Sequence, residues 1–161
     1  MKTTAEQAKQ DAHDNLVNNL QELLEKNYDA EKGFTKAMKD AENSRLKGFL
    51  KRQAAQRAQF VNELDQEIRN LNETPKDSGS FKGDMHRTWI DIKTAFTGDN
   101  DEAVLEECIR GEKASVEEYQ ERLEKNHFPP HVTSVLTNQL NTIQGTLNNV
   151  KTLEDAIDRA G

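Results

Sequence analysis

The chain has 161 residues, of which 34% are hydrophobic and 32% are charged, with a formal net charge of −7. This length fits a single domain, residues 1–161, and suffices to bury a hydrophobic core. Because acidic charge prevails and the basic residues are interleaved among the acids, we expect no nucleic-acid partner. No run reaches the roughly 20 apolar residues of a membrane-spanning helix, and the first residues lack the apolar core of a signal peptide, so we expect no membrane partner and a cytoplasmic location. The single cysteine, Cys108, excludes an internal disulfide and a cysteine-rich zinc site.

The first half of the chain carries apolar residues every three or four positions, which predicts two helices joined by a tight turn. The face of the first helix runs from Leu16 to Ala41, and we expect residues 1–10 to be frayed. Asn43 and Ser44 offer capping oxygens for the second helix, whose face runs from Leu46 to Leu71. Because the turn is short, the two helices must run antiparallel.

Residues 73–99 are predicted to connect the two halves of the chain. Pro75, Gly79 and Gly83 interrupt the helical spacing there. A short apolar stripe at helical spacing follows them and consists of Met85, Trp89, Ile92 and Phe96. We therefore expect a long connector that carries a short helix.

The second half of the chain predicts another pair of helices. The acids from Asp99 to Glu102 provide a cap and first-turn charges for a third helix, whose face runs from Leu105 to Leu123. Pro129 and Pro130 end this helix and begin the fourth, because proline suits the first turn of a helix and no later one. The apolar face of the fourth helix is expected to continue from Val132 to Ile157.

These elements predict an all-α fold, an antiparallel four-helix bundle made of two helical hairpins. Helices of about 27–30 residues are roughly 40–45 Å long at about 1.5 Å per residue, and the connector is long enough to span that distance. We favour the ferritin-like order, in which a long crossover between the second and third helices leaves them parallel. The alternative is an up-down-up-down bundle with a broken third helix.

Every predicted helix carries polar residues where the spacing predicts apolar ones. They are Asn27 and Glu31 in the first helix, Gln53 and Arg57 in the second, Glu112 in the third and Gln139 in the fourth. Counted from the turn at Asn43, Glu31 and Arg57 lie at similar heights, while Glu112 and Gln139 lie near the middle of the second hairpin. In a crossover bundle the two middles coincide, so we expect one central buried polar cluster.

This cluster can be compared with ferritin-like carboxylate sites, which take a lone Glu from each of two helices and Glu-x-x-His from each of the other two. Glu31 and Glu112 would supply the two lone glutamates. Arg57 and Phe60 occupy the Glu and His places of the second helix, and the fourth helix has neither acid nor imidazole near Ile143. We expect no metal and no cofactor, and an Arg57 that bridges the two glutamates. The alternative is an iron or manganese ion held by Glu31 and Glu112.

The chain resembles a bacterial family of ferritin-like four-helix-bundle proteins known only as a domain of unknown function and first catalogued from a Pseudomonas genome. The resemblance covers roughly Leu16 to Ile157. Its carriers are Glu31-Lys-Gly-Phe34, Ala54-Ala55-Gln56-Arg57, His86-Arg-Thr-Trp89 with Ile92 and Lys93, Thr97-Gly98-Asp99, and Arg110-Gly111-Glu112. It implies the ferritin-like fold and no established activity.

Three hypotheses about function follow. The first is a non-catalytic bundle without a di-metal site, acting in stress physiology or as an assembly module, and its stress role rests on analogy alone. The second is a metal-binding protein for iron or manganese oxidation or storage that uses Glu31 and Glu112. The third is a helix-mediated interaction module. A homo-oligomer would form through helix faces or through the connector near Trp89.

Overall fold

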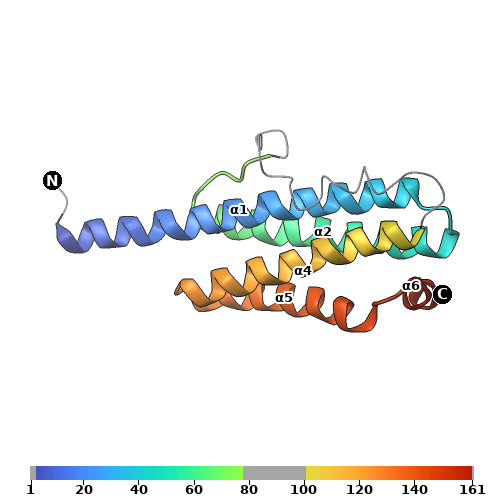
Figure 1. Cartoon of the computed structure of the whole chain (residues 1–161). Coiled ribbons are helices and arrows are strands. Elements are labelled where there is room, and N and C mark those ends of the chain that lie inside the picture. Colours follow the sequence, from blue (N-terminus) through green and yellow to red (C-terminus); the bar gives the residue numbers. More distant parts are fainter. Residues whose placement is uncertain (1–2, 78–100, 161) are drawn as a thin grey trace.

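The computed structural model describes residues 3–77 and 101–160, and this part of the chain contains five α-helices and no β-strand (Figure 1). The helices are α1 Thr4–Asp40, α2 Ser44–Asn70, α4 Asp101–Lys125, α5 Pro130–Asn149 and α6 Leu153–Ala160. The predicted all-helical class is thereby confirmed. Within the described ranges no helix is long and apolar enough to cross a membrane. The predicted short helix around Trp89 lies outside the described residues.

The helix boundaries follow from local capping. The Thr3 side chain accepts a hydrogen bond from the Glu6 amide at 3.1 Å, and the Glu6 carboxylate accepts one from the Thr3 amide. Helix α1 therefore begins at Thr4, rather than after the ten residues expected to be frayed. The Asn43 side chain caps α2, as predicted, by accepting from two backbone amides. Pro130 opens α5, also as predicted.

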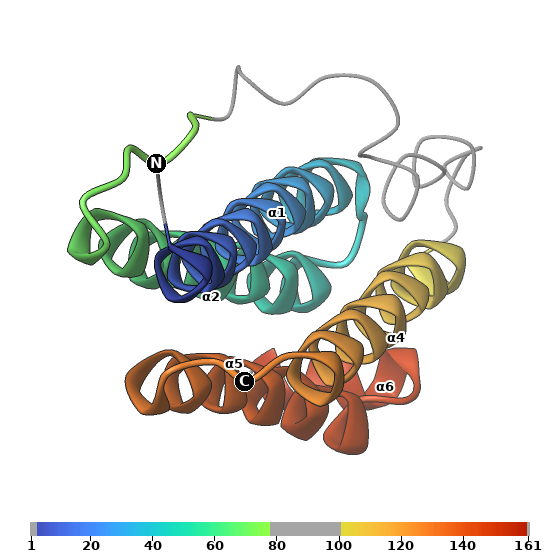
Figure 2. The same ribbon diagram turned by 90° about the vertical axis from the view of Figure 1, so that its left-hand side faces the viewer.

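Contacts between the helix ends fix their directions. Both carboxylate oxygens of Asp101, the first residue of α4, accept backbone amides of Glu42 and Asn43 in the α1–α2 turn at 2.8 Å. At the opposite end of α4, Asn126 accepts a hydrogen bond from Asn15 of α1 at 2.9 Å. Thus α2 and α4 start from the same end and run in the same direction, which is the order expected of a crossover (Figure 1). Viewed along the helices, the α1–α2 pair lies beside the α4–α5 pair (Figure 2).

The fourth helix is shorter than predicted. The expected face from Val132 to Ile157 is split, because α5 ends at Asn149 and a separate α6 begins at Leu153. Asp155 accepts the amide of Thr152 at 3.2 Å and its own amide donates to the Thr152 hydroxyl at 3.2 Å, which forms a new helix start. The helix therefore breaks where the sequence offers a second cap.

The core consists of two apolar clusters. One gathers residues nearer the start of α1, such as Leu20, Leu64 and Leu136, and the other gathers residues nearer its end, such as Phe34 and Leu50. Between these clusters, α1, α2 and α4 carry the buried polar residues Asn27, Asp29, Gln53, Arg57 and Glu112. A polar layer therefore divides the core at mid-length.

Candidate functional site

The centre of the polar layer is a buried ion pair. Arg57 of α2 is 1% exposed, and its Nη2 pairs with Oε1 of Glu112, which is 3% exposed on α4. Its Nη1 donates to Oδ1 of Asn27 on α1 at 2.7 Å. The guanidinium also lies over the Phe60 ring, 5.8 Å from the centroid. Arg57 thus joins three helices, and among the described residues its charge is paired with the carboxylate of Glu112.

A directional chain of hydrogen bonds leads from this pair toward the surface of α2. Asn27 Nδ2 donates to the Tyr119 hydroxyl at 2.9 Å, and that hydroxyl donates to Oε1 of Gln139 at 2.5 Å. Gln139 Nε2 then donates to Oε1 of Glu63 at 2.9 Å. Every donor points away from Arg57. The chain therefore ties α1, α2, α4 and α5 together at one level.

Burial sets the protonation states of two groups beside the pair. Desolvation raises the pKa of Tyr119 to about 12, against the opposing effects of Arg57 and of the Asn27 hydrogen bond. Its hydroxyl is accordingly neutral at physiological pH and can donate to Gln139. Burial, with smaller contributions from Glu112 and Glu107, also raises the pKa of the Cys108 thiol. Cys108 is therefore a core residue and a poor nucleophile.

Glu31 does not join the cluster, contrary to the sequence prediction. It is half-buried, and no hydrogen bond or ion pair connects it to Arg57 or Glu112 in the structure. Its pKa is raised by desolvation, with Lys32 opposing the shift. Ala30, fully buried, takes the core position instead. Arg57 consequently bridges Glu112 and Asn27, and not two glutamates.

Gln53 also lies apart from the hydrogen-bond chain. It is 8% exposed and it lines a groove between α2 and α5. Its Oε1 is buried and has no hydrogen-bond partner among the described residues. Of the six residues predicted to meet, the structure brings together Asn27, Arg57, Glu112 and Gln139.

Two residues of the hydrogen-bond chain, Tyr119 and Glu63, were not among the polar residues predicted to meet. Tyr119 was assigned to the apolar face of its helix, and its hydroxyl is the link between Asn27 and Gln139. Glu63 lies on the flank of α2 and was not singled out. A buried tyrosine usually finds a partner for its hydroxyl, and this was the available signal for Tyr119.

The donor set at the centre does not fit a di-metal carboxylate site. The carboxylate of Glu112 is buried there, and the permanent charge of Arg57 is paired with it. Glu31 stands apart from both. Across residues 3–77 and 101–160, no three His, Cys, Asp or Glu side chains form a group that could hold a metal ion.

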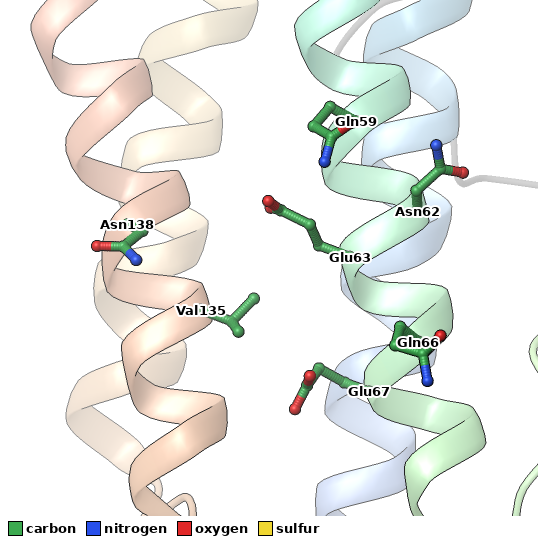
Figure 3. Close-up of a pocket in the computed structure, with 7 residues that line it drawn as sticks. All are labelled: Gln59, Asn62, Glu63, Gln66, Glu67, Val135 and Asn138. Carbon is green, nitrogen blue, oxygen red and sulfur yellow. The ribbon is translucent and has the colours of Figure 1, made fainter.

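The seam between α2 and α5 is hollowed by two grooves. The first, of about 310 Å³, is lined by Gln59, Asn62, Glu63, Gln66, Glu67, Val135 and Asn138 (Figure 3). The second, of about 380 Å³, is lined by Phe49, Arg52, Gln53, Thr142, Gly145, Thr146, Asn149 and Val150. Glu63 thus links the internal hydrogen-bond chain to the first groove.

A comparison with protein families gives one match. The model of the family described as "Domain of unknown function (DUF2383)" matches residues 15–125, which include the Arg57–Glu112 pair and exclude α5 and α6. No curated protein matches the chain significantly.

Proposed function

The chain belongs to the family described as a domain of unknown function (DUF2383), and from this premise we propose that it is a ferritin-like four-helix bundle without a di-metal centre that serves as an assembly module. The parallel run of α2 and α4 supports the ferritin-like arrangement. The observation that carries the loss of the metal centre is the burial of Arg57 at mid-length. The single-domain extent and a cytoplasmic location remain predictions from the sequence.

Electrostatics explains why Arg57 and a metal ion exclude each other. Two unit charges about 4 Å apart interact by about 4 kcal/mol at an effective dielectric constant of about 20, so a dication beside the guanidinium would be repelled by about 8 kcal/mol. Glu112 is already paired with Arg57 and cannot offset this repulsion alone. A bound metal would have to displace the guanidinium, which would leave a buried charge without a partner.

The alternative, an iron or manganese protein using Glu31 and Glu112, has weaker support. The two carboxylates share no contact in the described part of the chain, and Glu31 has no buried partner there. A role in stress physiology rests on analogy with ferritin-like proteins alone.

Elemental analysis tests the proposal. The full chain is purified with and without added iron, manganese and zinc, and we expect substoichiometric metal and an unchanged melting temperature. The metal content of Glu31→Gln and of Glu112→Gln is compared with that of Glu121→Gln. This variant is the matched control because Glu121 is an exposed acid on α4. Stoichiometric metal that is lost in the first two variants and kept in the control would overturn the proposal.

A further inference from the structure

The α5 helix differs from the rest of the molecule in its charge. From Pro130 to Val150 it contains no Asp, Glu, Lys or Arg, although 32% of the chain is charged. Its exposed side chains are His131 and a set of uncharged polar residues: Thr133, Ser134, Asn138, Asn141, Thr142, Asn148 and Asn149. Depletion of charge marks the centre of protein interfaces more reliably than apolar character does.

The side chains of one copy do not close the seam between α5 and α2. Both grooves lie along it, one after the other, and Figure 3 shows the acidic groove with side chains of α2 and α5 facing each other across the opening. Gly145 borders the second groove, and a Cβ added there would meet nothing within 4 Å. The amide oxygen of Gln53, buried beside the same groove, has no hydrogen-bond partner among the described residues.

The two grooves carry opposite charges. The acidic groove contains Glu63 and Glu67, and the other contains Arg52, which is exposed, with no carboxylate in its lining. Arg52 and Glu63 are eleven residues apart on α2, which is about three helical turns, so they lie on one face about 16 Å apart. The seam therefore has a basic end and an acidic end.

We propose that two copies of this chain associate face to face through the α2–α5 seam, about a two-fold axis that crosses the seam, so that the Arg52 groove of each copy covers the Glu63 groove of the other. This inference rests on the proposed assembly function and names its surface. A two-fold axis parallel to the seam would instead set acid against acid and arginine against arginine. Charge thus selects the crossing axis, and the two neutral α5 helices then face each other.

The remaining surface favours the same choice. With a net charge of −7, two copies repel each other, and the neutral α5 surface is where this repulsion is weakest. A seam about 30 Å long and two helices, or about 20 Å, wide would bury roughly 600 Å² on each copy. The total of about 1,200 Å² is at the lower end of specific interfaces, so we expect a reversible dimer that depends on concentration.

Sedimentation equilibrium over a range of concentrations tests the proposal by comparing the wild type with two charge-reversal variants, their 1:1 mixture and a control variant. Arg52→Glu alone sets two acids against each other, and Glu63→Arg alone sets two arginines together, so each should weaken self-association at least tenfold. A 1:1 mixture of the two variants restores both ion pairs, and its dimer should be within about twofold of the wild type. Lys9→Glu, at an exposed position of α1, makes the net charge more negative by the same amount as Arg52→Glu, so it is the control for net charge and should have no effect.

Several outcomes would overturn the interface. Dimers that persist in both single variants would place assembly on another surface and leave the proposed function standing. A wild-type chain that is monomeric at every concentration would remove the interface and self-assembly together, whereas the metal analysis bears on the absent di-metal centre alone. If Glu63→Arg fails to fold because Gln139 loses its acceptor, Asn62→Arg replaces it, because Asn62 is exposed, lines the same acidic groove and would set a second arginine against Arg52 of the other copy. An undiminished dimer in that variant would equally overturn the proposal.

Discussion

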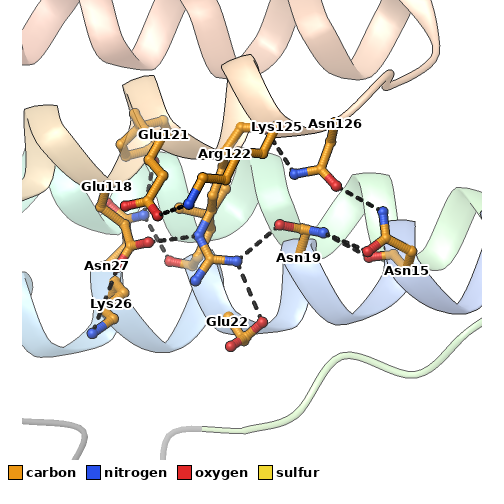
Figure 4. A network of polar contacts seen from close by, with 12 residues as sticks. Asn15, Asn19, Glu22, Lys26, Asn27, Glu118, Glu121, Arg122, Lys125 and Asn126 are labelled. Carbon is orange, nitrogen blue, oxygen red and sulfur yellow. Dashed lines mark hydrogen bonds and ion pairs between the residues drawn. The ribbon is translucent and has the colours of Figure 1, made fainter.

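Arg57 and Arg122 make similar contacts in opposite settings. Each donates to an asparagine of α1 and pairs with a glutamate of α4. The side chain of Arg57 is 1% exposed, whereas that of Arg122 is 14% exposed, beside Glu118, which is 27% exposed. Figure 4 shows Arg122 at the edge of the α1–α4 contact, among other polar side chains.

Burial changes what each arginine contributes. Around Arg122, water and neighbours such as Glu22, 3.3 Å from Nη1, can replace a lost partner. Around Arg57 such replacements are few, since Nε of Arg57 and Oε2 of Glu112 are buried without a hydrogen-bond partner in the described part of the chain. The same arginine–glutamate pair is therefore costly to break in the core and contributes little at the surface.

Removing the buried cation should have the largest effect. Arg57→Ala leaves Glu112 charged and unpaired in the core, so we expect a loss of about 3–5 kcal/mol in the free energy of unfolding, measured with urea. Arg57→Leu should be nearly as harmful, because Glu112 is 3% exposed and cannot reach water. The double variant Arg57→Met, Glu112→Leu should recover most of the loss. If Arg57→Leu left the free energy of unfolding unchanged, Glu112 would have to be hydrated.

The Tyr119 hydroxyl comes next. Tyr119→Phe removes one of the two acceptors of Asn27 Nδ2, which still donates to the Leu23 carbonyl, and removes the donor to Oε1 of Gln139, so we expect a loss of about 1–3 kcal/mol. The pKa of Tyr119 is raised to about 12, above the value of about 10 in an unfolded chain. Its contribution should be complete below pH 10 and should disappear as the pH rises from 10 to 12.

Urea unfolding at several alkaline pH values checks this dependence. The wild type should lose stability in that window faster than Tyr119→Phe does. The pKa of Tyr28 is also raised, by desolvation and by nearby carboxylates, but Tyr28 is present in both proteins, so its contribution cancels in this comparison. Parallel pH profiles for the wild type and Tyr119→Phe would contradict the burial of the hydroxyl.

The partly buried Arg122 should matter less than Arg57. Arg122→Ala loses its bonds to Glu118 at 2.8 Å and Asn19 at 2.9 Å, and we expect a loss of about 1 kcal/mol that shrinks in high salt. Unfolding curves at low and high ionic strength measure both quantities. An effect as large as that of Arg57→Ala, or one that salt leaves unchanged, would remove the contrast between the two sites.

The smallest effect is expected at Lys125. Its Nζ lies 2.6 Å from Oε1 of Glu121, but the two side chains are 69% and 58% exposed. Such pairs on helix surfaces contribute little, so Lys125→Ala should leave the unfolding midpoint unchanged within error. A clear shift would show that this end of α4 is more constrained than its exposure indicates.

Helix periodicity accounts for the parts of the site that could be predicted. One row of buried residues follows α1 at spacings of four and three, through Leu16, Leu20, Leu23, Asn27, Ala30, Phe34 and Ala37. Asn27 falls on this repeat, and so do the places of Arg57 in α2 and Gln139 in α5. Glu31 misses it by one residue. A buried face with a 3.5-residue period drifts around a straight helix, so its positions must be counted strictly by four and three. Counted in this way from Asn27, the next buried position is Ala30 and not Glu31.

Capping signals had the same local character. The Thr152-Leu-Glu-Asp155 string matches a helix start, and reading it would have ended the fourth helix early. The role of Asp101 was harder to predict. It was expected to serve its own helix, but it binds the amides of Glu42 and Asn43 in a distant turn. That contact depends on the approach of two elements about 60 residues apart.

The sequence by itself determined the long helices, the turn at Asn43, the proline boundary at Pro130 and the polar residues at mid-length, because capping and apolar spacing act within a few residues. The tertiary structure decided which of those polar residues meet. Whether Arg57 reaches Glu112 rather than Glu31 depends on the rotation and height of three helices relative to one another. The same arrangement hollowed the α2–α5 seam, whose grooves are lined by side chains of both helices, and no single helix carries that information.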